Sequence, residues 1–210
     1  IGCNKDAVEA CPKTWADLFD SQKFPGKRTF YKWSAPGVIE AALLADGVAA
    51  DKLYPLDLDR AFKKLDTIKG DIVWWDSGAQ SQQLLASAEA PFGSFWNGRL
   101  TALAETGVTV ETSWTNNITA ADALVVPKGT KNKDAAMKFI AQATSDAAQA
   151  QFAAATGYAP VNLDSNTLMD AELRKSLPDM QADTQINADM SYWAEHRDEI
   201  GTRWYAWQAK

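Results

Sequence analysis

Three side chains of this chain have the chemistry to hold a small molecule that carries both charges. Trp96 and Arg99 lie in the segment Phe-Trp-Asn-Gly-Arg at 95–99, and Asp122 follows after a strand-like interval. A guanidinium binds a carboxylate with two parallel hydrogen bonds, a carboxylate binds an ammonium, and an indole packs on the carbons between them. Each residue also has an ordinary structural alternative: a solvated helix turn for Arg99, backbone amide bonds for Asp122, and core packing for Trp96. No comparable set of nucleophile, base or metal ligands occurs, so we interpret the chain as a binding protein without metal or cofactor, and not as an enzyme.

The composition favours a folded protein that handles a small molecule. Of its 210 residues, 46% are hydrophobic, which is enough for one sizeable core or two small ones. The formal net charge is -6 and no block of Lys and Arg stands out, which argues against a nucleic-acid partner. No stretch approaches the roughly 20 apolar residues of a membrane span, so we expect a soluble chain without membrane insertion. The single histidine, His196, lies in a charged run and is expected on a solvated helix face.

Two cysteines, Cys3 and Cys11, flank a polar loop. Their spacing suits neither zinc nor a C-x-x-C redox motif, and in a reducing compartment both would be free thiols. In an oxidising compartment they can close the loop as a disulfide. The residues alone leave both states open, with pairing favoured because the chain has only these two cysteines.

The apolar residues switch repeatedly between the periods of strands and helices, which predicts an α/β sheet with helices on its faces. Strands are expected at 28–33, 71–75, 90–96, 108–114 and 121–127. Helices are expected at 38–44, 58–68, 81–86 and 98–105, then from 132, from 145 and within 187–207. Asn97 is predicted to cap the helix at 98–105.

Ligands of such sheets bind outside the carboxyl ends of the strands, at helix N-termini. Several further side chains of this chain follow expected strands or precede expected helices. The residues that join the candidate ligand-binding set are Trp33, Ser34, Gln80, Tyr158 and Trp193.

Several segments together resemble one known family. They are Thr-Trp-Ala-Asp-Leu-Phe at 14–19, Phe-Pro-Gly at 24–26, Phe-Trp-Asn-Gly at 95–98, Leu-Val-Val-Pro-Lys-Gly-Thr-Lys-Asn-Lys-Asp-Ala-Ala at 124–136 and Gly-Tyr-Ala-Pro-Val-Asn at 157–162. Their order and sequence resemble the spermidine/putrescine-binding branch of the ABC-transporter substrate-binding proteins. The resemblance implies a periplasmic-binding-protein-like (type II) α/β fold, with two lobes that close over a ligand and deliver it to a membrane permease. It also implies a periplasmic location, where Cys3 and Cys11 are expected to be bonded.

The resemblance implies a division of the chain between two lobes. Residues 1–116 and 163–210 are expected to form the second lobe, with helices on both faces of a mixed sheet. Residues 117–162 are expected to belong to the first lobe, most of which lies in further residues that family members carry ahead of this start. The chain therefore resembles a C-terminal fragment, and an incomplete lobe is expected to favour a homodimer.

The ligand class follows from departures within the resemblance. Polyamine-binding relatives carry acidic residues just after a strand of the second lobe, whereas here 33–37 reads Trp-Ser-Ala-Pro-Gly. They also carry a tryptophan where this chain has Ala120, and Arg99 would repel a diamine. The pattern is similar to members that bind γ-aminobutyrate and other ω-amino acids. Polyamine binding is the alternative ligand, and a dimerising interaction module without ligand is the alternative class.

Overall fold

The computed structural model describes residues 1–179 and 182–210. The chain divides into two compact units, which we call unit 1 (Ile1–Ala120 and Asp183–Lys210) and unit 2 (Ala121–Ala182). The resemblance implied that residues 163–182 belong with residues 1–116, whereas here they belong to unit 2. The assignment of the units to two lobes of a binding protein stays a prediction.

Unit 1 is built on a five-stranded mixed sheet with the strand order β3-β2-β4-β1-β5. The strands are β1 (Gly2–Asn4), β2 (Arg28–Tyr31), β3 (Ile72–Trp75), β4 (Phe92–Gly93) and β5 (Val110–Thr112). β2 pairs in parallel with β3 and β4, while β1 pairs antiparallel with β4 and β5. The four strands predicted in this unit, β2 to β5, are present and each is shorter than its expected segment, whereas β1 was not predicted.

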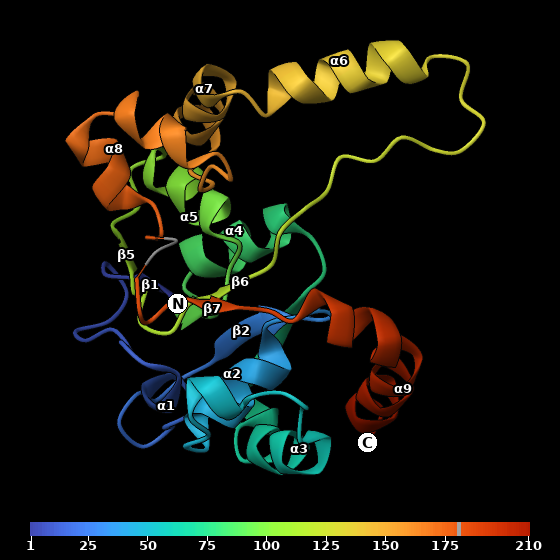
Figure 1. Ribbon diagram of the computed structural model, residues 1–210. Helices are drawn as coiled ribbons and strands as arrows, with labels where there is room; N and C mark the ends of the chain where they lie inside the picture. The colour runs from blue at the N-terminus through green and yellow to red at the C-terminus, as the bar shows by residue number, and fades with distance from the viewer. Residues whose placement is uncertain (180–181) are drawn as a thin grey trace. The chain divides into compact units, whose positions relative to one another are not determined.

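Helices cover both faces of this sheet, as predicted (Figure 1). They are α1 (Trp15–Leu18), α2 (Val38–Ala45), α3 (Leu58–Asp66), α4 (Gly78–Ala86), α5 (Asn97–Ala104) and α9 (Met190–Gln208), with 3-10 turns η1 (Ala50–Lys52) and η2 (Lys69–Asp71). The main core joins α1, α2, α3 and α9 to β2, and a smaller cluster joins α4 to α5. Trp193 and Trp204 of α9 join this helix to the first 116 residues through hydrogen bonds to Glu40 and to the carbonyl of Lys32.

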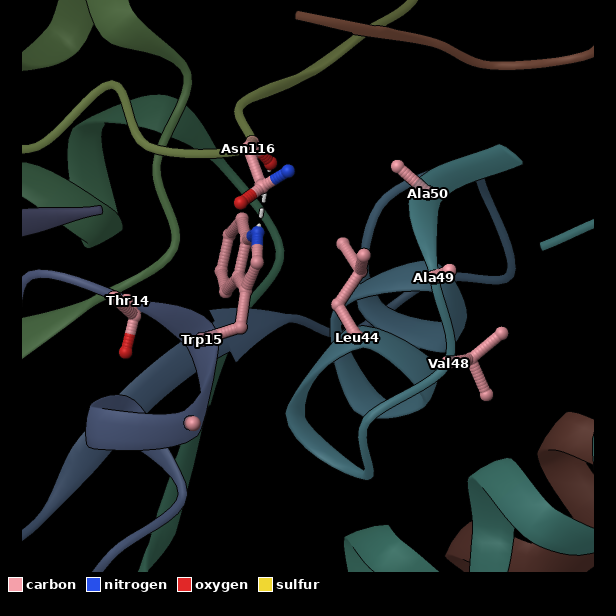
Figure 2. Close-up of a pocket in the computed structure, with 8 residues that line it drawn as sticks. Thr14, Trp15, Leu44, Val48, Ala49, Ala50 and Asn116 are labelled. Carbon is pink, nitrogen blue, oxygen red and sulfur yellow. Dashed lines mark hydrogen bonds between the residues drawn. The ribbon is translucent and has the colours of Figure 1, made fainter. Parts of the chain in front are cut away.

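Local signals set where these helices begin. Thr14 and Asp17 form a capping box, in which each side chain accepts a backbone N–H of the other, at the start of α1. α1 also contacts the chain that leaves β5, because Trp15 Nε1 donates to the carbonyl of Asn116 over 2.8 Å (Figure 2). The prediction that Asn97 caps α5 is wrong: Asn97 is the first helical residue and Trp96 occupies the N-cap position without a side-chain bond.

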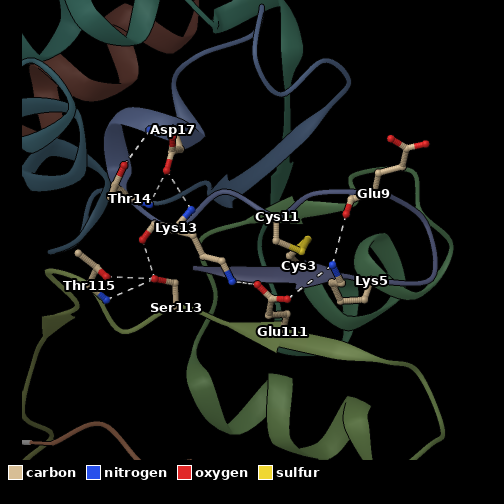
Figure 3. A network of polar contacts seen from close by, with 10 residues as sticks. All are labelled: Cys3, Lys5, Glu9, Cys11, Lys13, Thr14, Asp17, Glu111, Ser113 and Thr115. Carbon is tan, nitrogen blue, oxygen red and sulfur yellow. Dashed lines mark hydrogen bonds and ion pairs between the residues drawn. A yellow bond between two sulfur atoms is a disulfide. The ribbon is translucent and has the colours of Figure 1, made fainter.

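Cys3 and Cys11 form a disulfide, as expected from the resemblance. Both sulfur-bearing residues are buried, and the bond ties β1 to the loop before α1. Glu111 of β5 forms ion pairs with Lys5, which lies within the loop closed by the disulfide, and with Lys13, just after that loop (Figure 3). The disulfide and the ion pairs together hold residues 3–13 against the edge of the sheet.

Two further short strands, β6 (Ile118–Thr119) and β7 (Ile186–Asn187), pair in parallel within unit 1. The segment 121–127 was predicted as a strand, and this is wrong: it has no regular structure. A strand needs a neighbour for its backbone groups, and no described strand pairs with it.

Unit 2 is helical, with α6 (Lys133–Ala143), α7 (Asp146–Thr156), η3 (Leu163–Thr167) and α8 (Ala171–Ser176). Its small core consists of Ala150, Ala153, Met169 and Leu177, with Leu173 packed against it. α6 contains no buried residue. No helix in the described part of the chain is long and apolar enough to cross a membrane.

Candidate functional site

The carboxyl end of the parallel strands β2 and β3 carries three aromatic rings in mutual contact. The ring centroids of Tyr31 and Trp75, which end these strands, lie 4.6 Å apart. Trp96, just before α5, lies 5.2 Å from Tyr31 and 4.9 Å from Trp75. Trp75 is buried and donates from Nε1 to the carbonyl of Ser94, whereas Trp96 is 42% exposed. The cluster therefore has a buried base and an exposed apolar surface.

Arg99 lies one turn along α5 from this cluster, because its N–H donates to the carbonyl of Trp96 over 2.9 Å. Its side chain passes over Gly78, the first residue of α4: a Cβ added at Gly78 would lie 2.2 Å from Arg99 Nε. The guanidinium thus lies beside the positive end of a helix. Arg99 is exposed and forms no ion pair within the residues the structure describes. An exposed cation at such a place suits an anionic group of a ligand.

Three other predicted residues lie in the same part of unit 1. Trp33 follows β2, is 45% exposed and meets the ring of Tyr205 edge-on at 6.3 Å. Ser34 donates its N–H to the hydroxyl of Tyr205, and its buried Oγ has no partner in the described part of the chain. Gln80, in the first turn of α4, accepts the N–H of Asp76 at 2.9 Å. Gln80 therefore shapes the turn after β3 through its side chain.

The remaining predicted residues lie elsewhere. Trp193 belongs to unit 1 but is buried, and its Nε1 donates to Glu40 at 2.7 Å. Asp122 and Tyr158 belong to unit 2, where Asp122 is exposed and Tyr158 stacks on Phe152 with 6.5 Å between centroids. The structure thus brings Trp96, Arg99, Trp33, Ser34 and Gln80 to one end of the sheet in unit 1. The ligand-binding role of all eight residues stays a prediction.

Sequence reasoning did not nominate two residues of this end of the sheet, Tyr31 and Asp76. Burial, followed by the nearby groups of Tyr205 and Asp76, raises the pKa of the Tyr31 hydroxyl above its usual 10.0. Asp76 directly follows β3, and its charge acts on the Tyr31 hydroxyl. The sequence did contain a signal for Tyr31. It lies two residues before Trp33, and strand alternation puts residues at this spacing on one side of a predicted strand.

A separate pocket of about 260 Å³ lies between α1 and the end of α2 (Figure 2). Its lining residues are Thr14, Trp15, Ala16, Leu44, Val48, Ala49, Ala50 and Asn116. None of them is charged, and none belongs to the predicted site, so this pocket does not suit a zwitterion. No group of three metal-ligating side chains occurs among residues 1–179 and 182–210.

Comparison with known proteins shows the protein family to which the chain belongs. Residues 1–188 match the model of the bacterial extracellular solute-binding protein family, and the chain belongs to this family. This confirms the predicted family and the prediction of a solute-binding protein rather than an enzyme.

Individual members of this family and solved structures are similar to the chain to different extents. The chain is 36% identical over 206 residues to the gamma-aminobutyric acid-binding protein of Pseudomonas aeruginosa, covering 95% of this chain and 58% of that protein. It is 26% identical over 182 residues to the spermidine/putrescine-binding periplasmic protein of Escherichia coli, covering 82% of this chain and 50% of that protein. A solved structure described as the Atu4243–GABA receptor is 79% identical, with a TM-score of 0.93, covering 100% of this chain and 65% of that one. The predicted fold class is confirmed, and the chain spans less than two-thirds of the length of these relatives.

Proposed function

We propose that this chain is part of the periplasmic solute-binding component of an ABC importer and binds a small zwitterionic ω-amino acid such as γ-aminobutyrate. The observation that carries the proposal is Arg99. It is an exposed guanidinium without an ion pair among the described residues, next to the exposed face of the Tyr31–Trp75–Trp96 cluster.

The chemistry of such a ligand fits these groups one by one. Arg99 offers a planar fork of N–H donors to the carboxylate, at a place where the α4 N-terminus adds favourable partial charge. The methylenes pack on the indole of Trp96. An aromatic ring of the cluster adds a cation–π contribution to the ammonium. Asp122 belongs to unit 2, and its role as partner of the ammonium is a prediction from the sequence alone. Charge-assisted hydrogen bonds of this kind contribute about 1.5–3 kcal/mol each.

The relatives support the ligand and the transport role. The two proteins named for γ-aminobutyrate are more similar to this chain than the E. coli protein named for polyamines. A structure of an ABC transporter substrate-binding protein from Bradyrhizobium japonicum is 34% identical with a TM-score of 0.87. A membrane permease is the partner that such a role requires, and the disulfide fits a periplasmic location.

Titration of γ-aminobutyrate and putrescine into wild type and Arg99→Ala, by calorimetry on the natural full-length protein, tests the proposal. We expect Arg99→Ala to weaken γ-aminobutyrate binding at least about tenfold, or about 1.4 kcal/mol. Arg99→Lys restores binding only in part, because an ammonium does not fork onto both carboxylate oxygens. Arg197→Ala, which removes an exposed arginine from α9, is the matched control and should leave affinity unchanged. Tighter binding of putrescine than of γ-aminobutyrate by wild type would overturn the choice of ligand.

Self-association is a second candidate, favoured by the exposed apolar side chains of unit 2. Phe139 of α6 is 65% exposed and Val125 is 77% exposed, and exposed apolar surface of this kind favours association. Light scattering of the 210-residue chain over a concentration series tests this, and a mass that stays monomeric throughout would reject it.

A further inference from the structure

Glu40 is a completely buried carboxylate that the proposed binding chemistry does not use. It lies in the first turn of α2, and its relative exposure is 0%. No lysine or arginine in the described part of the chain pairs with it. A buried polar group needs hydrogen-bond partners within the protein, and Glu40 accepts three hydrogen bonds.

Three donors converge on this carboxylate, one from the N-cap of the same helix and two from other segments of the chain. Oε2 accepts the N–H of Gly37 at 2.8 Å. Oε1 accepts the hydroxyl of Tyr54 at 2.7 Å and Nε1 of Trp193 at 2.7 Å. Glu40 therefore joins the turn before α2 to the loop that contains Tyr54 and to the first turn of α9.

The turn that Glu40 holds is the one that carries two candidate ligand-binding residues. Residues 32–37 connect the carboxyl end of β2 to α2 and include Trp33 and Ser34. Gly37 has φ of 128°, a conformation that favours glycine, and its N–H is fixed by Glu40. The bond to Gly37 thus fixes the end of this turn.

Side chains of α9 form hydrogen bonds with the other end of the same turn. Trp204 Nε1 and Gln208 Nε2 both donate to the carbonyl of Lys32, at 2.8 and 2.9 Å. The hydroxyl of Tyr205 accepts the N–H of Ser34 at 3.4 Å. The turn is therefore held by α9 directly at 32–34 and through Glu40 at 37.

We propose that Glu40 is a positioning residue of the binding site, which fixes the 32–37 turn through Gly37 while Trp193 locks the carboxylate in place. Trp193 then acts through Glu40 and does not touch the ligand. This inference rests on the proposed function for its effect on affinity, but its effect on the turn is independent of any ligand.

Glu40→Gln isolates the bond to the turn. A glutamine oxygen can still accept from Tyr54 and Trp193, but its NH₂ group then faces the N–H of Gly37, so only this bond is lost. We expect faster hydrogen exchange in a peptide that covers 33–37, and a Kd for γ-aminobutyrate raised about three- to tenfold. Tyr54→Phe and Trp193→Phe each remove one donor from Oε1 and should give smaller changes in the same direction.

Trp207→Phe is the matched control. It removes the same kind of bond from the same helix, because Trp207 Nε1 donates to Asp66 of α3 at 2.8 Å, but neither group hydrogen-bonds to the 32–37 turn within the part of the chain that the structure describes. We expect this variant to lose stability without a change in exchange at 33–37 or in Kd.

The outcomes distinguish the positioning role of Glu40 from the proposed ligand-binding function. Unchanged exchange at 33–37 in Glu40→Gln, or an equal change in Trp207→Phe, overturns the positioning role. A loss of affinity in Trp193→Phe alone, with Glu40→Gln and Tyr54→Phe like wild type, also overturns it and makes Trp193 a direct ligand contact. Faster exchange in Glu40→Gln together with a wild type that binds no ω-amino acid supports the positioning of the turn and rejects the proposed function.

Discussion

Unit 1 and unit 2 contain helices with similar local signals but bury their apolar side chains to different extents. In unit 1, Phe30 and Leu43 are fully buried and Trp204 is 1% exposed. In unit 2, α6 is an 11-residue helix without a buried residue, and its Met137 and Phe139 are 49% and 65% exposed. Local signals thus place both kinds of helix, whereas burial needs a partner surface, and α6 has none among the residues described with it. A short helix without such packing is only marginally stable.

The largest expected contrast between the units comes from one substitution made in each. Phe30→Ala removes a fully buried ring from β2 and should lower the free energy of unfolding by about 3–5 kcal/mol. Phe139→Ala, the same change on α6, should alter it by less than about 0.5 kcal/mol in the 210-residue chain. Urea unfolding measures both, with tryptophan fluorescence for the change in unit 1 and far-UV circular dichroism for the change in unit 2, because all nine tryptophans lie in unit 1. A loss at Phe139 comparable to that at Phe30 would show that α6 packs as tightly as β2.

The disulfide gives the next largest contrast, because it belongs to unit 1 alone. Cys3 and Cys11 are eight residues apart, and opening a loop of this size by the double change to alanine should cost about 2–3 kcal/mol. Hydrogen exchange in α1 should rise, while exchange in α7 stays as in wild type. Equal changes in both helices would mean that the two units unfold as one.

Two helix caps allow a finer comparison. Thr14 accepts the N–H of Asp17 at 3.0 Å in unit 1, and Ser145 accepts the N–H of Ala148 at 3.3 Å in unit 2. Replacement of either by alanine removes a cap worth about 1 kcal/mol. We expect Thr14→Ala to shift the main urea midpoint and Ser145→Ala to raise exchange only in α7. A shift of the main midpoint by Ser145→Ala would contradict separate stabilities.

The smallest effect is that of the ionisation of Tyr54, which changes stability only in alkaline solution. Burial, followed by the charge and hydrogen bond of Glu40, raises the pKa of the Tyr54 hydroxyl above its usual 10.0. Below pH 10.0 both states keep the proton, so stability is unaffected. Above it the unfolded chain loses the proton first, so stability falls as pH rises. Tyr54→Phe should reduce this alkaline slope in unfolding measurements, and an unchanged slope would contradict the raised pKa.

Much of the fold of unit 1 was predictable because its signals are periodic and local. The stripe of Leu58, Phe62 and Leu65 gave α3, and all three are buried as that stripe requires. The predicted strand at 121–127 failed for the opposite reason, since its apolar run is typical of a strand but strand formation depends on a neighbour. At the site, residue type nominated Trp96 and Arg99, yet nothing local indicated that Arg99 passes over Gly78 of another helix.

By itself, the sequence determined the family, the alternation of strands and helices, and the residue types suited to a zwitterion. These depend on residue order, periodicity and side-chain chemistry, which need no knowledge of distant contacts. Tertiary structure decided the role of each tryptophan. Trp96 lies exposed in a ring cluster, while Trp193 is buried with its N–H on Glu40, 153 residues away in the sequence. The same side chain is thus exposed in one place and hydrogen-bonded in the core in another, and for Trp193 only the packing of α9 on unit 1 sets its neighbour.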